Sequence, residues 1–159
     1  MKINMKFLII FFTIFLLNPN LAHAAMSSSS YDEVSLYKEG KKLVIRAKKL
    51  EKKNKKEKAK KLYLKAFSKF EKAYAKNKKN PDILNYLGYT LRKTGNLEKA
   101  EIFYLKGLDL DASHLGINEY LGELYVQTNR IKLAKKRLEV LNGCKCEEYE
   151  ELKELIENY

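Results

Sequence analysis

Residues 84–108, LNYLGYTLRKTGNLEKAEIFYLKGL, decide the fold. Their apolar residues recur at intervals of three and four in two runs, which is the pattern of two amphipathic helices. Thr94-Gly95-Asn96 separates the two runs and predicts a turn. Upstream, Asn80-Pro81 predicts the start of the first helix, because Asn caps helices well and Pro is favoured at the first helical position. The stretch therefore predicts a helical hairpin.

This hairpin recurs along the chain with a period of 34 residues. Three sets of positions carry the period: Ala66, Ala100 and Ala134; Tyr63, Leu97 and Ile131; and Phe70, Tyr104 and Leu138. A fixed period of this length indicates stacked supersecondary units. Gly88 and Gly122 occupy one position of the period inside predicted helices, where Gly costs roughly 1 kcal/mol relative to Ala. We therefore expect neighbouring helices to approach closely there, and an all-α fold.

The repeat resembles a known family. The motif Leu84-x-x-Leu87-Gly88-x-x-Leu91, followed by Ala100, Tyr104 and Gly107, is similar to the tetratricopeptide repeat, and a second copy runs from Asn118 to Leu141. The resemblance implies a helical-hairpin solenoid with about three repeats and a C-terminal capping helix. It also implies a module that binds a protein or peptide partner and carries out no catalysis, because this family is defined by its architecture.

The sequence predicts four segments: 1–24 signal peptide, 25–34 flexible spacer, 35–145 repeats and 146–159 capping helix. Within the repeats, the predicted divisions are 35–79 for an irregular first repeat with an extended basic hairpin, 81–114 for the second and 115–142 for the third.

The first segment has the features of an export signal. Lys2 and Lys6 precede an uncharged run from Phe7 to Leu17, and Ala22-His23-Ala24 offers small residues for cleavage after Ala24. An uncleaved N-terminal anchor is the alternative. Two further stretches, residues 86–95 and 119–125, resemble small periplasmic tetratricopeptide proteins of Alphaproteobacteria. We therefore expect a periplasmic or secreted protein from a Gram-negative bacterium.

The positive charge of the chain is concentrated in one segment. Residues 38–79 hold 19 Lys and Arg against 4 Asp and Glu, whereas residues 80–159 hold 11 against 14. If Gly40 corresponds to Gly88, the first repeat has extra residues that lengthen both its helices and place a turn near Asn54. The tip of this basic hairpin, with Lys52, Lys53, Lys55 and Lys56, should project into solvent. Either it contacts an anionic membrane or polymer, or its lysines reflect compositional bias alone; export argues against nucleic acid.

The resemblance implies that the first helices of successive repeats line a concave face. The candidate partner-binding residues on that face are Asn85, Tyr89, Arg92, Glu119, Glu123 and Gln127. This mixed set does not match the basic-and-Asn clamp with which some family members hold a peptide carboxylate. We expect an extended peptide or a partner helix to bind there.

Catalytic, cofactor and metal sites are not expected. His114 is the only His after residue 24 and should be an exposed loop residue, while Glu119 and Glu123 should form a solvated or ligand-facing pair rather than a metal site. Cys144 and Cys146 leave three alternatives open: a structural disulfide, two free residues, or metal or redox chemistry.

Overall fold

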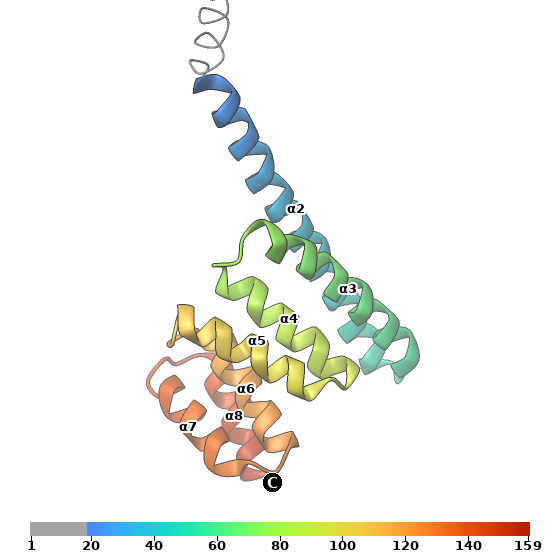
Figure 1. Ribbon diagram of the computed structural model, residues 1–159. Coiled ribbons are helices and arrows are strands. Elements are labelled where there is room, and N and C mark those ends of the chain that lie inside the picture. The colour runs from blue at the N-terminus through green and yellow to red at the C-terminus, as the bar shows by residue number, and fades with distance from the viewer. Residues whose placement is uncertain (1–18) are drawn as a thin grey trace, which may run out of the picture.

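The computed structural model describes residues 19–159 (Figure 1). Within this range the chain forms seven helices and no strand: α2 (Pro19–Lys52), α3 (Lys56–Lys76), α4 (Pro81–Thr94), α5 (Leu97–Leu110), α6 (Leu115–Gln127), α7 (Ile131–Leu141) and α8 (Glu147–Glu157). Consecutive helices run antiparallel as hairpins, and the hairpins stack side by side. The predicted all-α solenoid of helical hairpins is confirmed.

The boundaries of α4 follow from its sequence. Asn80 caps the first turn, because its Oδ1 accepts a hydrogen bond from the Ile83 amide at 3.3 Å. Gly95 ends the helix with a φ of 95°, a left-handed conformation that Gly adopts at little cost. Asn96 then caps α5 by accepting from the Lys99 amide. The turn and both helix starts therefore lie where the sequence predicts them.

The recurring glycines are positions of close packing. A Cβ on Gly88 would lie 2.5 Å from the ring of Tyr104, and one on Gly122 would lie 2.5 Å from the side chain of Leu152. Tyr104 and Leu152 are both fully buried. The space that these two glycines leave is thus filled by large side chains from a facing helix, which explains why the repeat accepts Gly inside helices.

The first hairpin is longer than the others. Its two helices turn at Asn54, whose φ is 56°, and the Lys55 amide donates to the Leu50 carbonyl at 2.9 Å. Below the turn, Glu51 accepts a hydrogen bond from the Tyr63 hydroxyl at 2.8 Å and pairs with Lys93 at 2.9 Å. The projecting tip therefore starts beyond Glu51. Its four predicted lysines are all exposed: Lys52, Lys53, Lys55 and Lys56.

The expectation of a flexible spacer over residues 25–34 differs from the structure, where these residues continue α2. The segment from 21 to 39 contains no Gly or Pro, and Ser costs only a few tenths of a kcal/mol in a helix. Glu33 also joins the helix to the loop between α3 and α4, because its carboxylate accepts hydrogen bonds from Asn77 and Asn80 at 3.3 and 3.0 Å. Most of the predicted signal peptide, residues 1–18, lies outside the described residues. No helix in residues 19–159 has both the length and the apolar character needed to cross a membrane.

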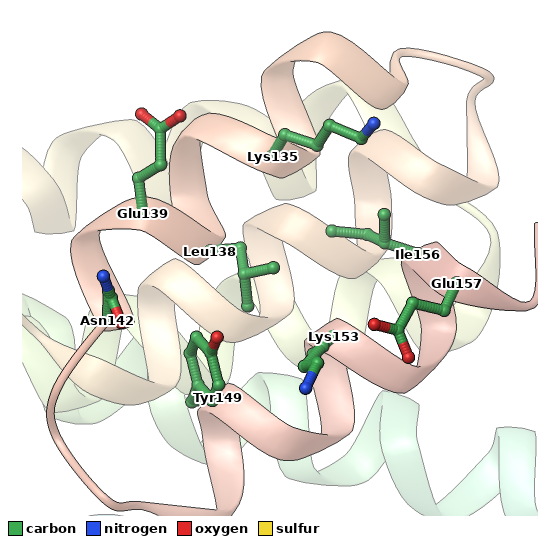
Figure 2. Close-up of a pocket in the computed structure, with 8 residues that line it drawn as sticks. All are labelled: Lys135, Leu138, Glu139, Asn142, Tyr149, Lys153, Ile156 and Glu157. Atoms are coloured by element: carbon green, nitrogen blue, oxygen red, sulfur yellow. The ribbon is translucent and has the colours of Figure 1, made fainter.

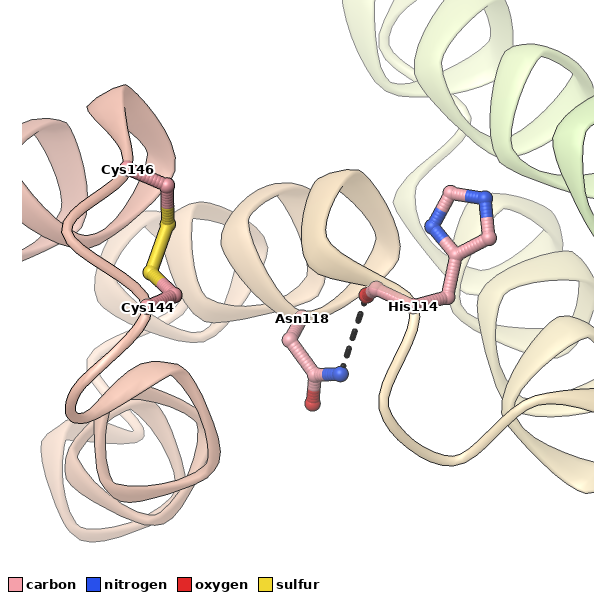
Figure 3. Close-up of a disulfide and its surroundings, with 4 residues drawn as sticks. All are labelled: His114, Asn118, Cys144 and Cys146. Carbon is pink, nitrogen blue, oxygen red and sulfur yellow. Dashed lines mark hydrogen bonds between the residues drawn. A yellow bond between two sulfur atoms is a disulfide. The ribbon is translucent and has the colours of Figure 1, made fainter.

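The solenoid ends at α8, which packs against α6 and α7. The loop before α8 contains a disulfide between Cys144 and Cys146 (Figure 3). A hollow of about 450 Å³ lies between α7 and α8, with Leu138, Tyr149 and Ile156 inside it and charged side chains around them (Figure 2). It marks the end of the stack.

Candidate functional site: a groove lined by α2, α4, α6 and α8

The first helices of the three hairpins share one face of the molecule with α8. The ring of Tyr37 on α2 lies 5.6 Å from that of Tyr86 on α4. The ring of Tyr89 on α4 lies 4.8 Å from that of Tyr120 on α6. Helix α8 packs against α6 on the far side. These contacts make a continuous surface across the solenoid, which we call the groove.

Tyrosines form the floor of the groove. Tyr89 is only 4% exposed, whereas Tyr37, Tyr86 and Tyr120 are half-buried. Burial raises the pKa of Tyr89 and of Tyr120, so both hydroxyls are neutral at physiological pH. The accessible aromatic area of the floor is therefore offered mainly by Tyr37, Tyr86 and Tyr120, and Tyr89 lies beneath it.

Cationic side chains of α2 and α4 lie over these rings. Lys41 Nζ lies 5.3 Å from the centre of the Tyr37 ring, and Lys48 Nζ lies 5.2 Å from that of Tyr89. The Arg92 guanidinium lies 5.7 Å from the centres of the Tyr89 and Tyr120 rings. Cation–π contacts of this kind favour a charge over the ring face. Sequence reasoning missed Lys41 and Lys48, although pairing Gly40 with Gly88 places Lys41 at the position of Tyr89.

Carboxyl groups cover the opposite side. Oxygen atoms of Glu119 and Glu123 on α6 and of Glu151 on α8 lie within 4.8 Å of one another. Glu119 is only 3% exposed because α8 covers it, so of the two expectations, a solvated or a ligand-facing pair, the solvated one does not hold for this residue. Burial, together with the hydrogen bond to Glu151 and the charge of Glu123, raises the pKa of Glu119 to about 9. Glu119 is therefore protonated at neutral pH.

Arg92 neutralises the second carboxylate of this cluster. Its Nη2 lies 2.5 Å from Glu123 Oε2, and both side chains are mostly buried. Burial disfavours the Arg92 charge, but Tyr104 and Glu123 raise the pKa of the guanidinium above its ordinary value. Oxygen ligands of this kind suit a hard divalent cation. Since one carboxyl keeps its proton and another is bound to arginine, the cluster is better described as an internal ion pair with a neutral neighbour.

A hollow of about 440 Å³ opens at the end of the groove where α4 and α6 begin. Asn85 lies in its floor and is 6% exposed, and its Oδ1 accepts no hydrogen bond from any described residue. The remaining lining residues come from α2, α4, the α5–α6 loop, α6 and α8: Tyr37, Lys41, Asp82, Tyr86, Asp111, Ser113, His114, Leu115, Gly116, Glu119, Tyr120 and Glu148.

His114 differs from the exposed loop residue that the sequence predicts, because only 14% of its side chain is exposed. Its Nδ1 accepts from the Ile117 amide at 3.2 Å and so caps α6. The other nitrogen, Nε2, therefore carries the hydrogen and points to Asp82 Oδ1 at 3.4 Å. Asn118 fastens the same loop, because its amide donates to the carbonyl oxygens of Ala112 and His114 at 3.0 Å (Figure 3). His114 is thus a helix cap on the wall of the hollow.

The structure brings together most of the residues that the sequence proposed for partner binding. Asn85, Tyr89 and Arg92 lie on the α4 side of the groove, and Glu119 and Glu123 lie on the α6 side. Gln127 is exposed at the last position of α6 and makes none of the contacts described above. Their role in binding stays a prediction.

Comparisons with known proteins agree with this architecture. A sequence profile of the tetratricopeptide repeat matches residues 69–102, which run from the second half of α3 through α4 into α5. No curated protein sequence matches the chain.

Solved structures of tetratricopeptide repeat (TPR) domains are similar in fold. The Arabidopsis OM64 TPR domain has a TM-score of 0.55 and 12% identity, and the match covers 77% of this chain and 98% of that one. The first TPR domain of Spaghetti (RPAP3), bound to the HSP90 peptide SRMEEVD, has a TM-score of 0.54 and 19% identity, and the match covers 75% of this chain and 91% of that one. The Yersinia enterocolitica type III secretion translocator chaperone SycD has a TM-score of 0.53 and 17% identity, and the match covers 76% of this chain and 89% of that one. At these identities the likeness establishes the TPR fold.

Proposed function

We propose that this protein is a non-catalytic adaptor of the bacterial cell envelope that holds a peptide or a helix of a partner protein in the groove. The observation that carries the proposal is the groove itself. Its floor of half-buried tyrosines lies between cationic side chains of α2 and carboxyl groups of α6 and α8. Aromatic rings supply contact area at low entropic cost, and flanking charges fix the register of a bound chain.

Two further points support the proposal. The first TPR domain of Spaghetti, which has the same fold, binds a peptide. The setting in the envelope rests on the sequence, where the charged start, the short uncharged run and the small residues before Ala25 are typical of a cleaved export signal.

Site-specific photo-crosslinking in cells tests both parts of the proposal. A photoreactive amino acid placed at Tyr86, on the groove floor, should form an adduct with a partner protein in the periplasmic fraction. The matched control position is Leu105 on α5, which is 44% exposed and on the outer side of the second hairpin. Adducts of equal yield from Tyr86 and Leu105, or none from Tyr86, would contradict a role for the groove. Recovery of the full-length chain from the cytoplasm alone would contradict the envelope setting.

A second candidate function follows from the hairpin tip, which would dock the protein on an anionic membrane surface. Lys52, Lys53, Lys55 and Lys56 are all exposed, and the two lengthened helices hold them beyond the groove. Attraction to an anionic bilayer amounts to about 1 kcal/mol per basic residue near the surface. Only some of the four can reach a flat surface together, so we expect weak binding.

Co-sedimentation with vesicles measures this binding. Vesicles of anionic phospholipid should retain the protein at low salt and release it at high salt, because exposed charges are screened within about 8 Å at physiological ionic strength. Changing the four tip lysines to Glu should abolish retention. The control is a variant with four Lys→Glu changes at exposed positions outside the tip: Lys78, Lys79, Lys132 and Lys136. Equal retention by neutral and anionic vesicles would show that the tip is an inert solvated turn.

A further inference from the structure

We propose that the hollow at the end of the groove binds a basic side chain, lysine or arginine, of the bound peptide. This inference rests on the proposed function and adds the chemistry of the partner: the segment recognised carries a cationic residue at one fixed position. Three features of the hollow support it, namely its charge, its hydrogen-bonding groups and its aromatic walls.

The hollow is acidic although the chain as a whole has a formal charge of +12. Asp82, Asp111 and Glu148 line it, together with the protonated Glu119, against the single lysine Lys41. They come from α4, from the end of α5, from α6 and from α8, so the fold gathers them from distant parts of the sequence. A local field of this sign attracts cations and repels the acidic peptides that suit a basic groove.

A second, independent observation is the unpaired hydrogen-bond acceptor in the floor. Asn85 is almost fully buried and its Oδ1 has no donor among the described residues. A buried amide oxygen without a donor costs roughly 1–3 kcal/mol. Asn85 lines the hollow, so an ammonium or guanidinium group that enters the hollow is the donor that we expect for Oδ1. The protonated Glu119 lines the same hollow and adds a neutral hydrogen-bonding group beside Asn85.

The walls complete the site. Tyr37, Tyr86 and Tyr120 line the hollow, and ring faces attract cations. Lys41 makes such cation–π contacts within the protein, since its Nζ lies 5.3 Å from the Tyr37 ring centre and 5.8 Å from that of Tyr86. Its flexible stem lets it leave the rings when a ligand cation enters. The Nε2–H of His114 is directed to Asp82 and holds one carboxylate at the mouth.

Selection from a peptide library tests this inference separately from the proposed function. A library of random twelve-residue peptides is selected on the immobilised full-length protein, and the enriched peptides are synthesised. We expect them to share a Lys or Arg at one position. Replacing that residue by norleucine, which keeps the stem and removes the charge, should weaken binding at least tenfold, and replacing it by Glu should weaken it further.

A charge-removing variant links the effect to the hollow. The double change Asp82→Asn and Glu148→Gln should weaken binding of the basic peptide at least tenfold and leave binding of its norleucine analogue unchanged. The matched control, Glu98→Gln with Asp109→Asn on the exposed side of α5, should have no effect on either peptide. If the enriched peptides share no basic residue, or bind the wild type and the double variant with equal affinity, the inference would be overturned and the groove would remain a peptide site. Failure to enrich any peptide would overturn both proposals.

Discussion

Replacing Arg92 by Met should lower the free energy of unfolding by about 3 kcal/mol. Arg92 and Glu123 form a mostly buried ion pair, with 11% and 21% of their side chains exposed. Removing one partner of such a pair leaves an uncompensated charge in a site that water hardly reaches. The cost is higher here, because Glu119 and Glu151 lie beside Glu123, and among residues 19–159 no other ion pair joins a cation to these three carboxyl groups.

Urea denaturation of the wild type and of Arg92→Met measures the difference. Arg46→Met is the matched control, because Arg46 is exposed on α2 and should tolerate the change within about 0.5 kcal/mol. Adding Glu123→Gln to Arg92→Met should restore a large part of the lost stability, since it removes the stranded charge. A loss below 1 kcal/mol, or no recovery in the double variant, would mean that the pair is solvated and contributes little.

The second large effect concerns Glu119→Gln, which should stabilise the protein increasingly as the pH rises. Burial, the hydrogen bond to Glu151 and the charges of Glu123 and Glu148 raise the pKa of Glu119 to about 9, whereas an unfolded Glu titrates near 4.3. Between these values the folded chain holds a proton that the unfolded chain has lost, so the free energy of unfolding falls as the pH rises.

Gln mimics the protonated carboxyl and does not titrate. The advantage of the variant over the wild type should therefore grow by roughly 1 kcal/mol per pH unit between about pH 5 and pH 9 and then level off. Arg92 on α4 reaches the cluster through Glu123 and stays charged throughout this range. Denaturation series at several pH values test the slope, with Glu154→Gln on the exposed side of α8 as the control. Parallel curves for Glu119→Gln and the wild type would show that Glu119 ionises normally.

Much of the fold could be predicted from residue spacing. The 34-residue period identified the hairpins because each repeat must bury the same positions against its neighbours. Asn80 and Gly95 act as caps in the structure for the local reasons that made them recognisable in the sequence. The Ser-rich segment before residue 35 was interpreted wrongly, because Ser is common in both linkers and helices and the deciding contact, Glu33 with Asn77 and Asn80, joins distant residues.

The groove was predictable only in part. The α4 and α6 residues follow from their position in the repeat, so the sequence alone suggested Asn85 and Arg92 as residues of this face. The contributions of α2 and α8 lie outside the regular period, and Lys48 and Glu151 therefore had no signal of their own. The burial of Glu119 depends on how α8 docks, which periodicity does not encode. The cap formed by His114 was also missed, since His is not among the usual N-cap residues.

The linear order of the hairpins has a consequence for partial unfolding of the protein. Helix α4 packs against α3 on one side and against α5 and α6 on the other, so it is the joint between the basic first hairpin and the acidic C-terminal half. In a linear array each unit contacts only its neighbours, so the stability of the whole is approximately a sum of unit and interface contributions. Opening at α4 would split the molecule into two helical pieces, and the groove, whose walls belong to both, would disappear before either piece melted. Amide exchange in α4 is therefore the natural measure of how long a bound partner can be held.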